Sequence, residues 1–437
     1  MHANKRDAGL IRVVGVWTLA ASIVSMIVGA GIFAVPAALA AAVGAYAPLT
    51  FLACGFAIAA VALCFAEGGS RLPTSGGVYG FVEAAFGPLV GYIGGTLLWV
   101  SCVLAAGGVT GALADLIASL LPWPTAGWVR IAVILVVLSP IVLVNVAGVA
   151  HGARLAGATT ALKLVPLILF VVVGAGAVHA ANFSHAAPPD AQSLGRALTL
   201  AVFSLLGMEG SLCVSGEVRE PNRTIPRALL IAVLLTTALY VAIQSVAQGI
   251  LGSALASSKA PLADAMGSIH PLLRALMLAG TALSMFGWMS SDILGSPRQL
   301  FAFARDGQLP RLLGRVSPRR HVPYVAVLCY AAAAVVLAIT GTFGELVVLA
   351  TLGLAALYAA GCAAAWLLAR RGVALAGPPL NFRYLSLAAA IGISGMLGLI
   401  LLASRQEILG LMALIALSGL VYLVQSRIAA RQPALGS

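Results

Sequence analysis

Long apolar runs separated by short polar segments fill the chain from one end to the other. A run of about 20 apolar residues is long enough to cross the roughly 30 Å hydrocarbon core of a bilayer as a helix. The pattern therefore predicts an all-α polytopic membrane protein with about twelve transmembrane helices. The expected spans cover residues 14–38, 46–66, 86–118, 129–148, 155–178, 195–216, 226–251, 271–303, 324–340, 345–369, 384–403 and 407–427.

The composition agrees with one membrane-embedded unit. Of the 437 residues, 61% are hydrophobic and 9% are charged, whereas a soluble domain carries about 25% charged residues. No polar stretch is long enough for a separate soluble domain, so residues 1–437 are expected to form a single transmembrane unit. The basic N-terminal segment is expected to remain, because the apolar stretch after it is too long for a signal peptide.

Lysine and arginine are distributed unequally between the two sides of these spans. One side carries Arg130, Arg196, Lys259, Arg274 and Arg405, Lys163 lies within a span, and the rest of the 25 basic residues lie on the other side. Cytoplasmic loops are enriched in Lys and Arg. We therefore expect a cell inner (plasma) membrane protein with both termini in the cytoplasm.

The net charge of +12 follows mostly from this topology. The basic residues are split among short loops without stacking aromatics, so membrane lipids are the expected partner and nucleic acid is not. The six cysteines contain no CxxC pair and the six histidines fall mainly in loops or span ends, so no disulfide, metal or cofactor is expected. GxSxG, HExxH and phosphate-loop motifs are missing from the sequence, which argues against an enzyme.

Two spans are interrupted by glycine. The first interruption lies in SMIVGAGIFAVP, with Gly29, Ala30, Gly31 and Pro36, and the second in FSLLGMEGSLCVSGE, with Gly207, Glu209 and Gly210. In lipid such interruptions are tolerated where they line a cavity or are buried in protein. Glycines can also simply allow close helix packing, but the paired positions and the embedded carboxylate favour a site.

The two interruptions open successive five-span blocks, about 12–180 and about 193–370, with two additional C-terminal helices at about 384–427. This arrangement is typical of an inverted repeat whose discontinuous helices meet near the bilayer midplane. Half-helix N-termini present free N–H groups to a carboxylate, and half-helix C-termini present carbonyls to an ammonium group. A zwitterionic α-amino acid carries both groups.

Several motifs together resemble the amino acid–polyamine–organocation (APC) superfamily. They are GAGIF at 29–33 with Pro36, PTSGGVYGFVEAAFGPLVGY at 73–92, FSLLGMEG at 203–210, EVREPNRTIPRA at 217–228 and FAFARDGQLP at 301–310. The resemblance implies a leucine-transporter-like fold with a 5+5 inverted repeat and discontinuous helices 1 and 6. It also implies alternating access, with substrate held near the two interruptions.

The resemblance assigns roles to individual residues. Gly29, Ala30 and Gly31 match the segment that receives the substrate carboxylate, Gly207 and its neighbours match the segment that receives the amino group, and Phe203 matches the aromatic that closes over the substrate. Tyr92, Glu209 and Tyr358 resemble the inner gate of the arginine/agmatine antiporter branch. Met26, Phe203, Met208 and Cys213 would make the substrate pocket mostly apolar.

Four of the charged residues within expected spans are weighed individually here: Lys163, Glu209, Asp292 and Arg298. Lys163 follows the cytoplasmic-edge Arg154 by nine residues, about 13 Å of helix, and matches a lysine of proton-coupled relatives. At that depth it is a candidate proton-coupling residue, although a lysine can also snorkel to the interface. Glu209 could hold a substrate cation, take up a proton or bond the unwound backbone. Asp292 and Arg298 do not share a helix face, so each could pair elsewhere, and Arg298 could belong to the cytoplasmic end of its span.

We therefore expect secondary active transport of amino acids across the inner membrane by alternating access, with proton-coupled symport of a neutral amino acid preferred. A cationic amino acid/polyamine antiporter is the first alternative, motivated by Glu209, Tyr92 and Tyr358. A non-transporting amino-acid-binding membrane sensor is the second. The expected partners are an amino acid or amine substrate, protons and membrane lipids, and a homodimer stays open.

Overall fold

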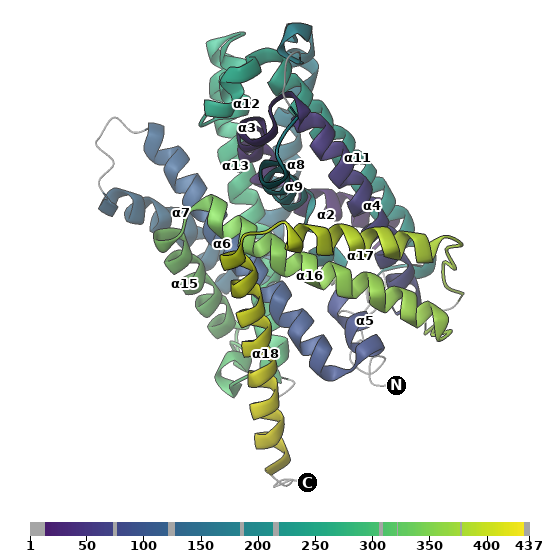
Figure 1. Ribbon diagram of the computed structural model, residues 1–437. Coiled ribbons are helices and arrows are strands. Elements are labelled where there is room, and N and C mark those ends of the chain that lie inside the picture. The colour runs from purple at the N-terminus through teal and green to yellow at the C-terminus, as the bar shows by residue number, and fades with distance from the viewer. Residues whose placement is uncertain are drawn as a thin grey trace.

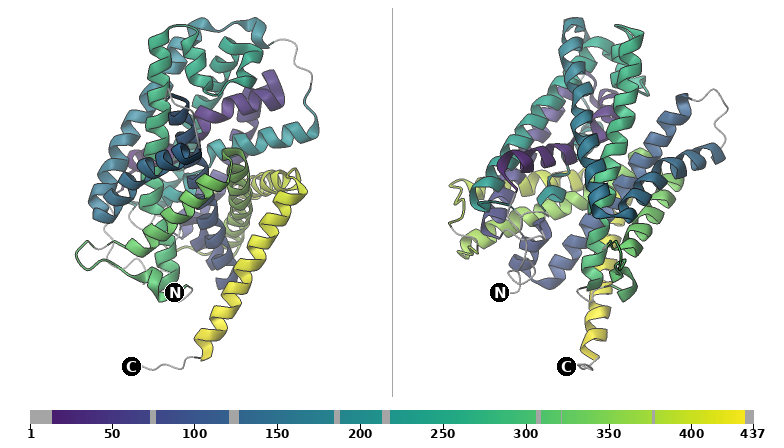
Figure 2. Two further views of the ribbon diagram at one scale, coloured as in Figure 1. Left: turned by 90° about the vertical axis from the view of Figure 1, so that its left-hand side faces the viewer. Right: turned by 180° about the vertical axis from the view of Figure 1, so that it is seen from behind.

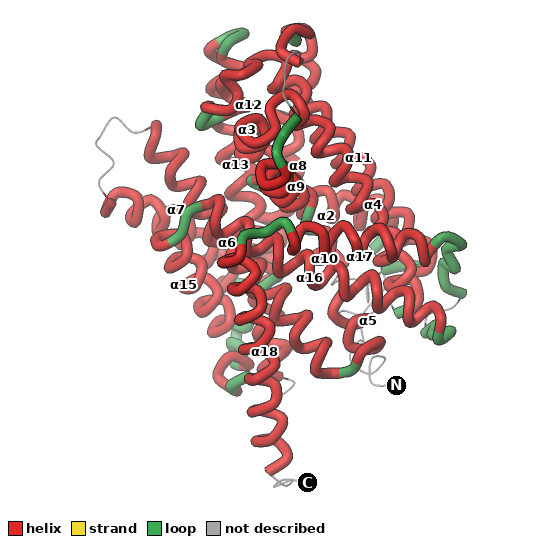
Figure 3. The backbone as a smooth tube through the Cα atoms, in the orientation of Figure 1, coloured by secondary structure: helices red, strands yellow, loops and turns green. Residues whose placement is uncertain are grey.

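The computed structural model describes residues 14–72, 77–120, 127–183, 188–212, 218–305, 309–320, 322–375 and 378–431. Within these ranges the chain is helical, and its extended pairing is limited to one bridge between Val14 and Val218. Figure 3 shows the same all-helical backbone. Cys213, expected in the substrate pocket, lies outside the described residues.

Every expected span contains a helix, so the all-α polytopic class is confirmed. The uninterrupted ones are α4 (Ala47–Arg71), α6 (Pro88–Leu120), α7 (Gly127–Ala147), α8 (Val149–Gly174), α11 (Pro221–Leu251), α13 (Pro271–Gly295), α15 (Tyr324–Thr340), α16 (Phe343–Arg370), α17 (Leu385–Leu401) and α18 (Arg405–Arg431). In the described part of the chain, eight helical stretches are long and apolar enough to cross a membrane, and shorter apolar helices accompany them.

The two spans with the predicted glycine interruptions are discontinuous in the structure. The first consists of α2 (Val16–Ile27) and α3 (Gly31–Val43), and the second of α9 (Ala191–Leu205) and α10 (Met208–Leu212). We call residues 28–30 the first break and residues 206–207 the second break. Gly31 and Glu209 lie just beyond them, in the first turns of α3 and α10.

Several expected boundaries differ from the helix ends by a few residues, and two of these differences have a clear physical cause. The span expected at 271–303 matches the apolar stretch Pro271–Ala304, but its helix is interrupted between α13, which ends at Gly295, and α14 (Pro297–Arg305), because Pro297 has no N–H for the helical hydrogen bond. The span expected from residue 155 starts at Val149, because Gly148, with φ of +154°, turns the chain directly out of α7. Apolar periodicity also gave no sign of α5 (Gly77–Phe86) or α12 (Pro261–Gly267), which lie in the connections.

The helices pack so that the two breaks lie inside the bundle. α11 packs along α4 and α2, α16 along α6, and α13 along α8 (Figure 1). α12 lies at one end of the molecule, and the C-terminal half of α18 extends beyond the bundle at the opposite end (Figures 1 and 2). The buried core includes both breaks and their neighbouring helices.

Candidate substrate site

The two breaks touch each other, and glycine makes this approach possible. A Cβ atom at Gly207 would lie 2.6 Å from the carbonyl oxygen of Met26, and Gly207 has φ of +129°. A Cβ atom at Gly31 would lie 2.8 Å from Ser204 Oγ and 3.0 Å from its Cα. Contacts below 3.0 Å would force the backbone apart, so side chains at these positions would separate the half-helices.

Three side chains from other helices cap the C-terminal end of α2. Lys163 Nζ donates to the carbonyl oxygen of Ser25. Trp288 Nε1 donates to Met26 O at 3.2 Å, and Tyr240 OH donates to Ile27 O at 3.1 Å. The last carbonyls of a helix have no partner within it, and here protein donors satisfy three of them. The N–H groups at the start of α3 have no such partner within their helix and lie at the first break.

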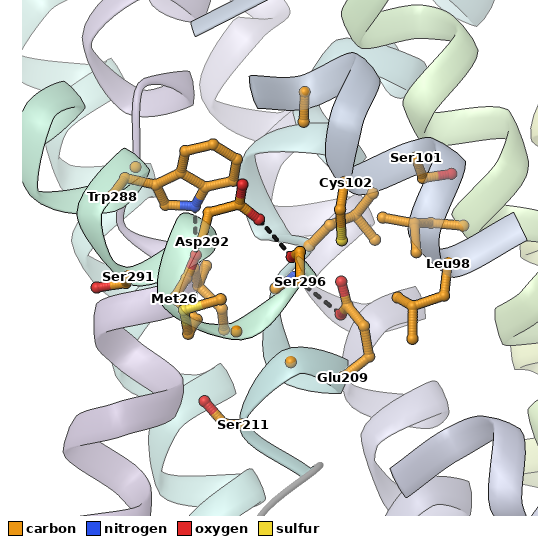
Figure 4. A pocket seen from close by; sticks show the side chains of 18 of the residues that line it. Met26, Leu98, Ser101, Cys102, Glu209, Ser211, Trp288, Ser291, Asp292 and Ser296 are labelled. Atoms are coloured by element: carbon orange, nitrogen blue, oxygen red, sulfur yellow. Dashed lines mark hydrogen bonds between the residues drawn. The ribbon is translucent and has the colours of Figure 1, made fainter. Parts of the chain in front are cut away.

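A cavity of about 940 Å³ connects the two breaks with α6, α13, α14 and α16. It is lined by seven of the residues expected in the site: Met26, Gly29, Ala30, Gly31, Phe203, Gly207 and Glu209. Met208 is fully buried and does not line the cavity. Figure 4 shows Met26, Glu209, Trp288 and Asp292 gathered around this space.

The cavity is open toward the N-terminal end of α2. Thr18, Ala21 and Ser22 line it and are exposed, whereas Gly29 and Gly31 line it and are buried. At the inner part of the cavity Phe203 is partly buried and contacts Phe343 edge-on, with ring centroids 6.2 Å apart. The cavity is therefore accessible from the end of the molecule at which α2 begins.

Glu209 and Tyr358 are brought together, but Tyr92 makes its contacts elsewhere. Glu209 is buried, and its carboxylate accepts hydrogen bonds from Gly207 N at 3.0 Å and from Tyr358 OH. Tyr92 packs against Phe303 and Tyr422, with ring centroids 5.3 and 5.5 Å apart. Phe303 lines the cavity, whereas Tyr92 and Tyr358 do not. The gating role of the two tyrosines stays a prediction.

Lys163 lies in α8 beside the first break and is fully buried. Its ammonium group donates to Ser25 O at the end of α2. Within the described residues no ion pair involves Lys163. This cation at a helix C-terminus is in the favourable position for the helix dipole, and it links α8 to α2.

Sequence reasoning missed how α13 and α14 contribute to the cavity. Trp288, Asp292 and Arg298 all line it. Asp292 and Arg298 are six residues apart and would not share a face of one continuous helix, so each could pair elsewhere. The ion pairs of the described residues include neither of them, and both line the cavity because α13 ends at Gly295 and Arg298 belongs to α14. Pro297 was the signal in the sequence that could have indicated this break.

A polytopic helical bundle with two discontinuous helices around a buried, one-sided cavity defines a membrane transporter. Residues 14–425 match the amino acid permease family, and the chain belongs to this family. The family and its motifs confirm the resemblance to the APC superfamily found in the sequence. Its members are permeases rather than enzymes.

Three relatives cover about three quarters of the chain. An uncharacterized transporter of Mycobacterium tuberculosis is 33% identical over 347 residues, 76% of this chain and 74% of the relative. The serine/threonine exchanger SteT of Bacillus subtilis is 29% identical over 343 residues, 75% of this chain and 76% of the relative. The branched-chain amino acid permease BcaP of Bacillus subtilis is 27% identical over 351 residues, 74% of each chain.

Proposed function

We propose that this protein carries a neutral amino acid across the inner membrane by alternating access, in symport with protons. The observation that supports it most directly is the cavity that joins the N-terminal end of α3 to the second break. One end of that space offers backbone N–H groups and the other offers half-helix carbonyls, which are complementary to the two charges of an α-amino acid.

The capping of α2 restricts where the ammonium and carboxylate groups of the substrate can bind. Because Lys163, Trp288 and Tyr240 occupy three carbonyls of α2, the substrate ammonium group is assigned to the carbonyls at the C-terminal end of α9. The substrate carboxylate is assigned to the N–H groups around Gly29 and Gly31. Each half-helix then serves one charge, and the side chain of the substrate points into the rest of the cavity.

A neutral substrate is favoured over a cationic one. Glu209 already accepts hydrogen bonds from Gly207 and Tyr358, and Met26 and Leu98 line the cavity with apolar surface. The names of two relatives refer to serine/threonine and to branched-chain amino acids, which are neutral. Glu209 in the cavity wall supports the alternative, a cationic amino acid/polyamine antiporter, since a carboxylate there could hold a substrate cation.

The open side of the cavity is assigned to the cytoplasm, so the structure represents an inward-facing state. The exposed residues Thr18, Ala21 and Ser22 lie in the half of the first span nearest the N-terminus, which the basic residues place inside. Phe203 then closes the substrate site from the outer side. Both termini in the cytoplasm and contact with membrane lipids belong to the same proposal.

Transport is tested by counterflow in liposomes that contain only this protein. Liposomes loaded with an unlabelled neutral amino acid should accumulate the labelled one, because exchange through the cavity needs no external energy. A thermal-shift screen of the purified protein identifies which amino acids bind, since a ligand of the native state raises its stability. Binding without any exchange would reject a carrier in favour of a membrane sensor.

Lys163 is the proposed proton-coupling residue. Its buried ammonium group binds Ser25 O at the end of α2, so loss of its proton would weaken a contact that holds the half-helix in place. Lys163→Ala should abolish accumulation driven by a pH gradient but retain part of the counterflow. If the variant still concentrates substrate in response to that gradient, Glu209 becomes the leading candidate for coupling.

A further inference from the structure

Asp292 is a buried carboxylate in the cavity wall whose partners are neutral. It is 1% exposed. Ser296 Oγ donates to its Oδ1 and Tyr330 OH donates to its Oδ2, each at 2.6 Å. In the described part of the chain no ion pair includes Asp292. A buried carboxylate without a cation is costly at membrane depth. This cost indicates that Asp292 has a functional role.

The Asp292 carboxylate has capacity for a further hydrogen bond. An ionised carboxylate offers about four lone-pair sites, and the two hydroxyl donors occupy two of them. Tyr330 approaches from α15, outside the cavity lining, whereas Asp292 and Ser296 line the cavity. Figure 4 shows the Asp292 carboxylate beside the indole of Trp288 and hydrogen-bonded to Ser296.

The position of Asp292 fits the end of a substrate side chain. Trp288 lies beside the first break, since a Cβ atom at Gly29 would be 2.7 Å from its indole. Asp292 follows Trp288 by one turn of α13, about 6 Å along the helix axis. This is roughly the length of a short side chain plus one hydrogen bond, counted from a substrate held beside the first break.

Charge in the same wall favours a neutral donor over a cation. The guanidinium-bearing Arg298 is partly buried and lines the same cavity as Asp292. Its positive charge in the same cavity repels a cationic side chain of the substrate. A hydroxyl or carboxamide group can donate to Asp292 without meeting this repulsion.

We propose that Asp292 is a specificity-determining residue whose carboxylate accepts a hydrogen bond from a neutral donor on the substrate side chain. The carrier then prefers hydroxyl- and carboxamide-bearing amino acids to aliphatic amino acids of the same shape. This inference rests on the proposed function, which places the α-amino and α-carboxyl groups at the breaks. An aliphatic side chain would leave the carboxylate without this bond and would be rejected for that reason.

The test compares ligands of matched shape on purified full-length protein. Threonine and valine have the same shape, and glutamine and methionine have similar length, so each pair isolates the donor group. Titrations followed by thermal shift should give threonine and glutamine affinities about tenfold or more above those of their apolar counterparts. Asp292→Asn, which removes the charge, should reduce both ratios strongly while valine and methionine bind as before.

Tyr330→Phe is the matched control, because it breaks the contact from α13 to α15 without changing the cavity wall. It should keep the threonine preference. If Tyr330→Phe loses the preference as Asp292→Asn does, Asp292 only ties two helices together and the inference is wrong. Equal binding of threonine and valine by the unmodified protein, or tighter binding of lysine than of glutamine, would also overturn it while leaving amino acid binding intact. If no α-amino acid binds, the proposed function fails as well.

Discussion

At the scale of single residues, the close contact between the two breaks requires glycine, because a side chain at Gly31 or Gly207 would collide with the neighbouring half-helix. Gly207 adopts φ of +129° directly against Met26 O, and Gly31 lies against the Ser204 backbone. These contacts hold α3 against α9 and keep the N–H groups of the first break close to the second break. The same absence of side chains leaves the N–H groups accessible to a ligand.

Gly31→Val should abolish amino acid binding without preventing membrane insertion. The new side chain would collide with Ser204, whose Cα would lie 3.0 Å from the new Cβ, and would push the half-helices apart. Overpacking of this kind costs about 1–3 kcal/mol, enough to weaken binding by roughly tenfold or more. Thermal-shift titration measures the loss. Gly398→Val is the control, since a Cβ atom at Gly398 meets nothing within 4 Å; normal binding by Gly31→Val would place the site elsewhere.

Phe203→Ala should reduce transport far more than stability. Phe203 lines the cavity and contacts Phe343 edge-on, and in the proposed cycle its ring encloses the substrate and excludes water. Because Phe203 is partly buried, its removal should cost less than the roughly 3–5 kcal/mol of a fully buried phenylalanine. Counterflow and thermal unfolding are compared with Phe86→Ala, whose ring is 41% exposed outside the cavity. Unchanged counterflow would make Phe203 ordinary packing.

At the scale of elements, a buried ion pair fastens the end of α4 to the connection between α16 and α17. Arg71 Nε binds Glu67 Oε1 at 2.7 Å, and both side chains are almost fully buried. The guanidinium also donates to Asn381 Oδ1 at 2.7 Å and to Val373 O at 3.0 Å, while Glu67 Oε2 accepts from Phe382 N at 2.9 Å. One arginine and one glutamate thus fix the chain between two membrane helices.

Arg71→Ala should destabilise the protein by about 3–5 kcal/mol, because it leaves the Glu67 carboxylate buried without its cation. The loss is measured as a lower thermal unfolding temperature of the purified protein in detergent. Arg223→Ala is the matched control: its pair with Glu220 is 3.7 Å long, with side chains 71% and 72% exposed, and should contribute less than about 1 kcal/mol. Equal effects of the two variants would contradict this account of the Glu67–Arg71 pair.

The helices could be predicted where the lipid environment requires a long apolar run. Features that depend on tertiary contacts between distant residues could not be predicted. Apolar runs placed α15 at its observed bounds, because a span in lipid must satisfy its own backbone hydrogen bonds. The breaks were predictable from glycine for the same reason. The caps on α2 were not, because Tyr240 and Trp288 lie more than 200 residues from the carbonyls that they bind. Asp292 could be recognised from the sequence as a charged residue within a span. Its position in the cavity wall could not be predicted, because the shape of the cavity depends on where α13 ends.

At the scale of the whole molecule, the outer surface is apolar and suits lipid, whereas the cavity in the interior contains polar groups. α18 is largely exposed and carries Leu409, Leu417 and Leu420 on its surface, as expected for a helix that faces lipid tails. Glu209 and Asp292 line the cavity and are buried, and the access path lies at the N-terminal end of α2, where Thr18 and Ser22 are exposed. Substrate would therefore enter and leave along the bundle interior, and the direction of the open side depends on how the chain is oriented in the membrane.

The orientation is predicted to place the C-terminus in the cytoplasm. Cytoplasmic segments attract Lys and Arg, and the segment that joins α14 to α15 carries Arg311, Arg315, Arg319 and Arg320. The connection containing α12 lies at the opposite end of the molecule from the C-terminal end of α18 (Figure 1), and it should face the periplasm. An alkaline phosphatase reporter, active only in the periplasm, should be inactive when fused after Arg431 and active when inserted after Lys259. The reverse pattern would invert the carrier and turn the open side of the cavity toward the periplasm.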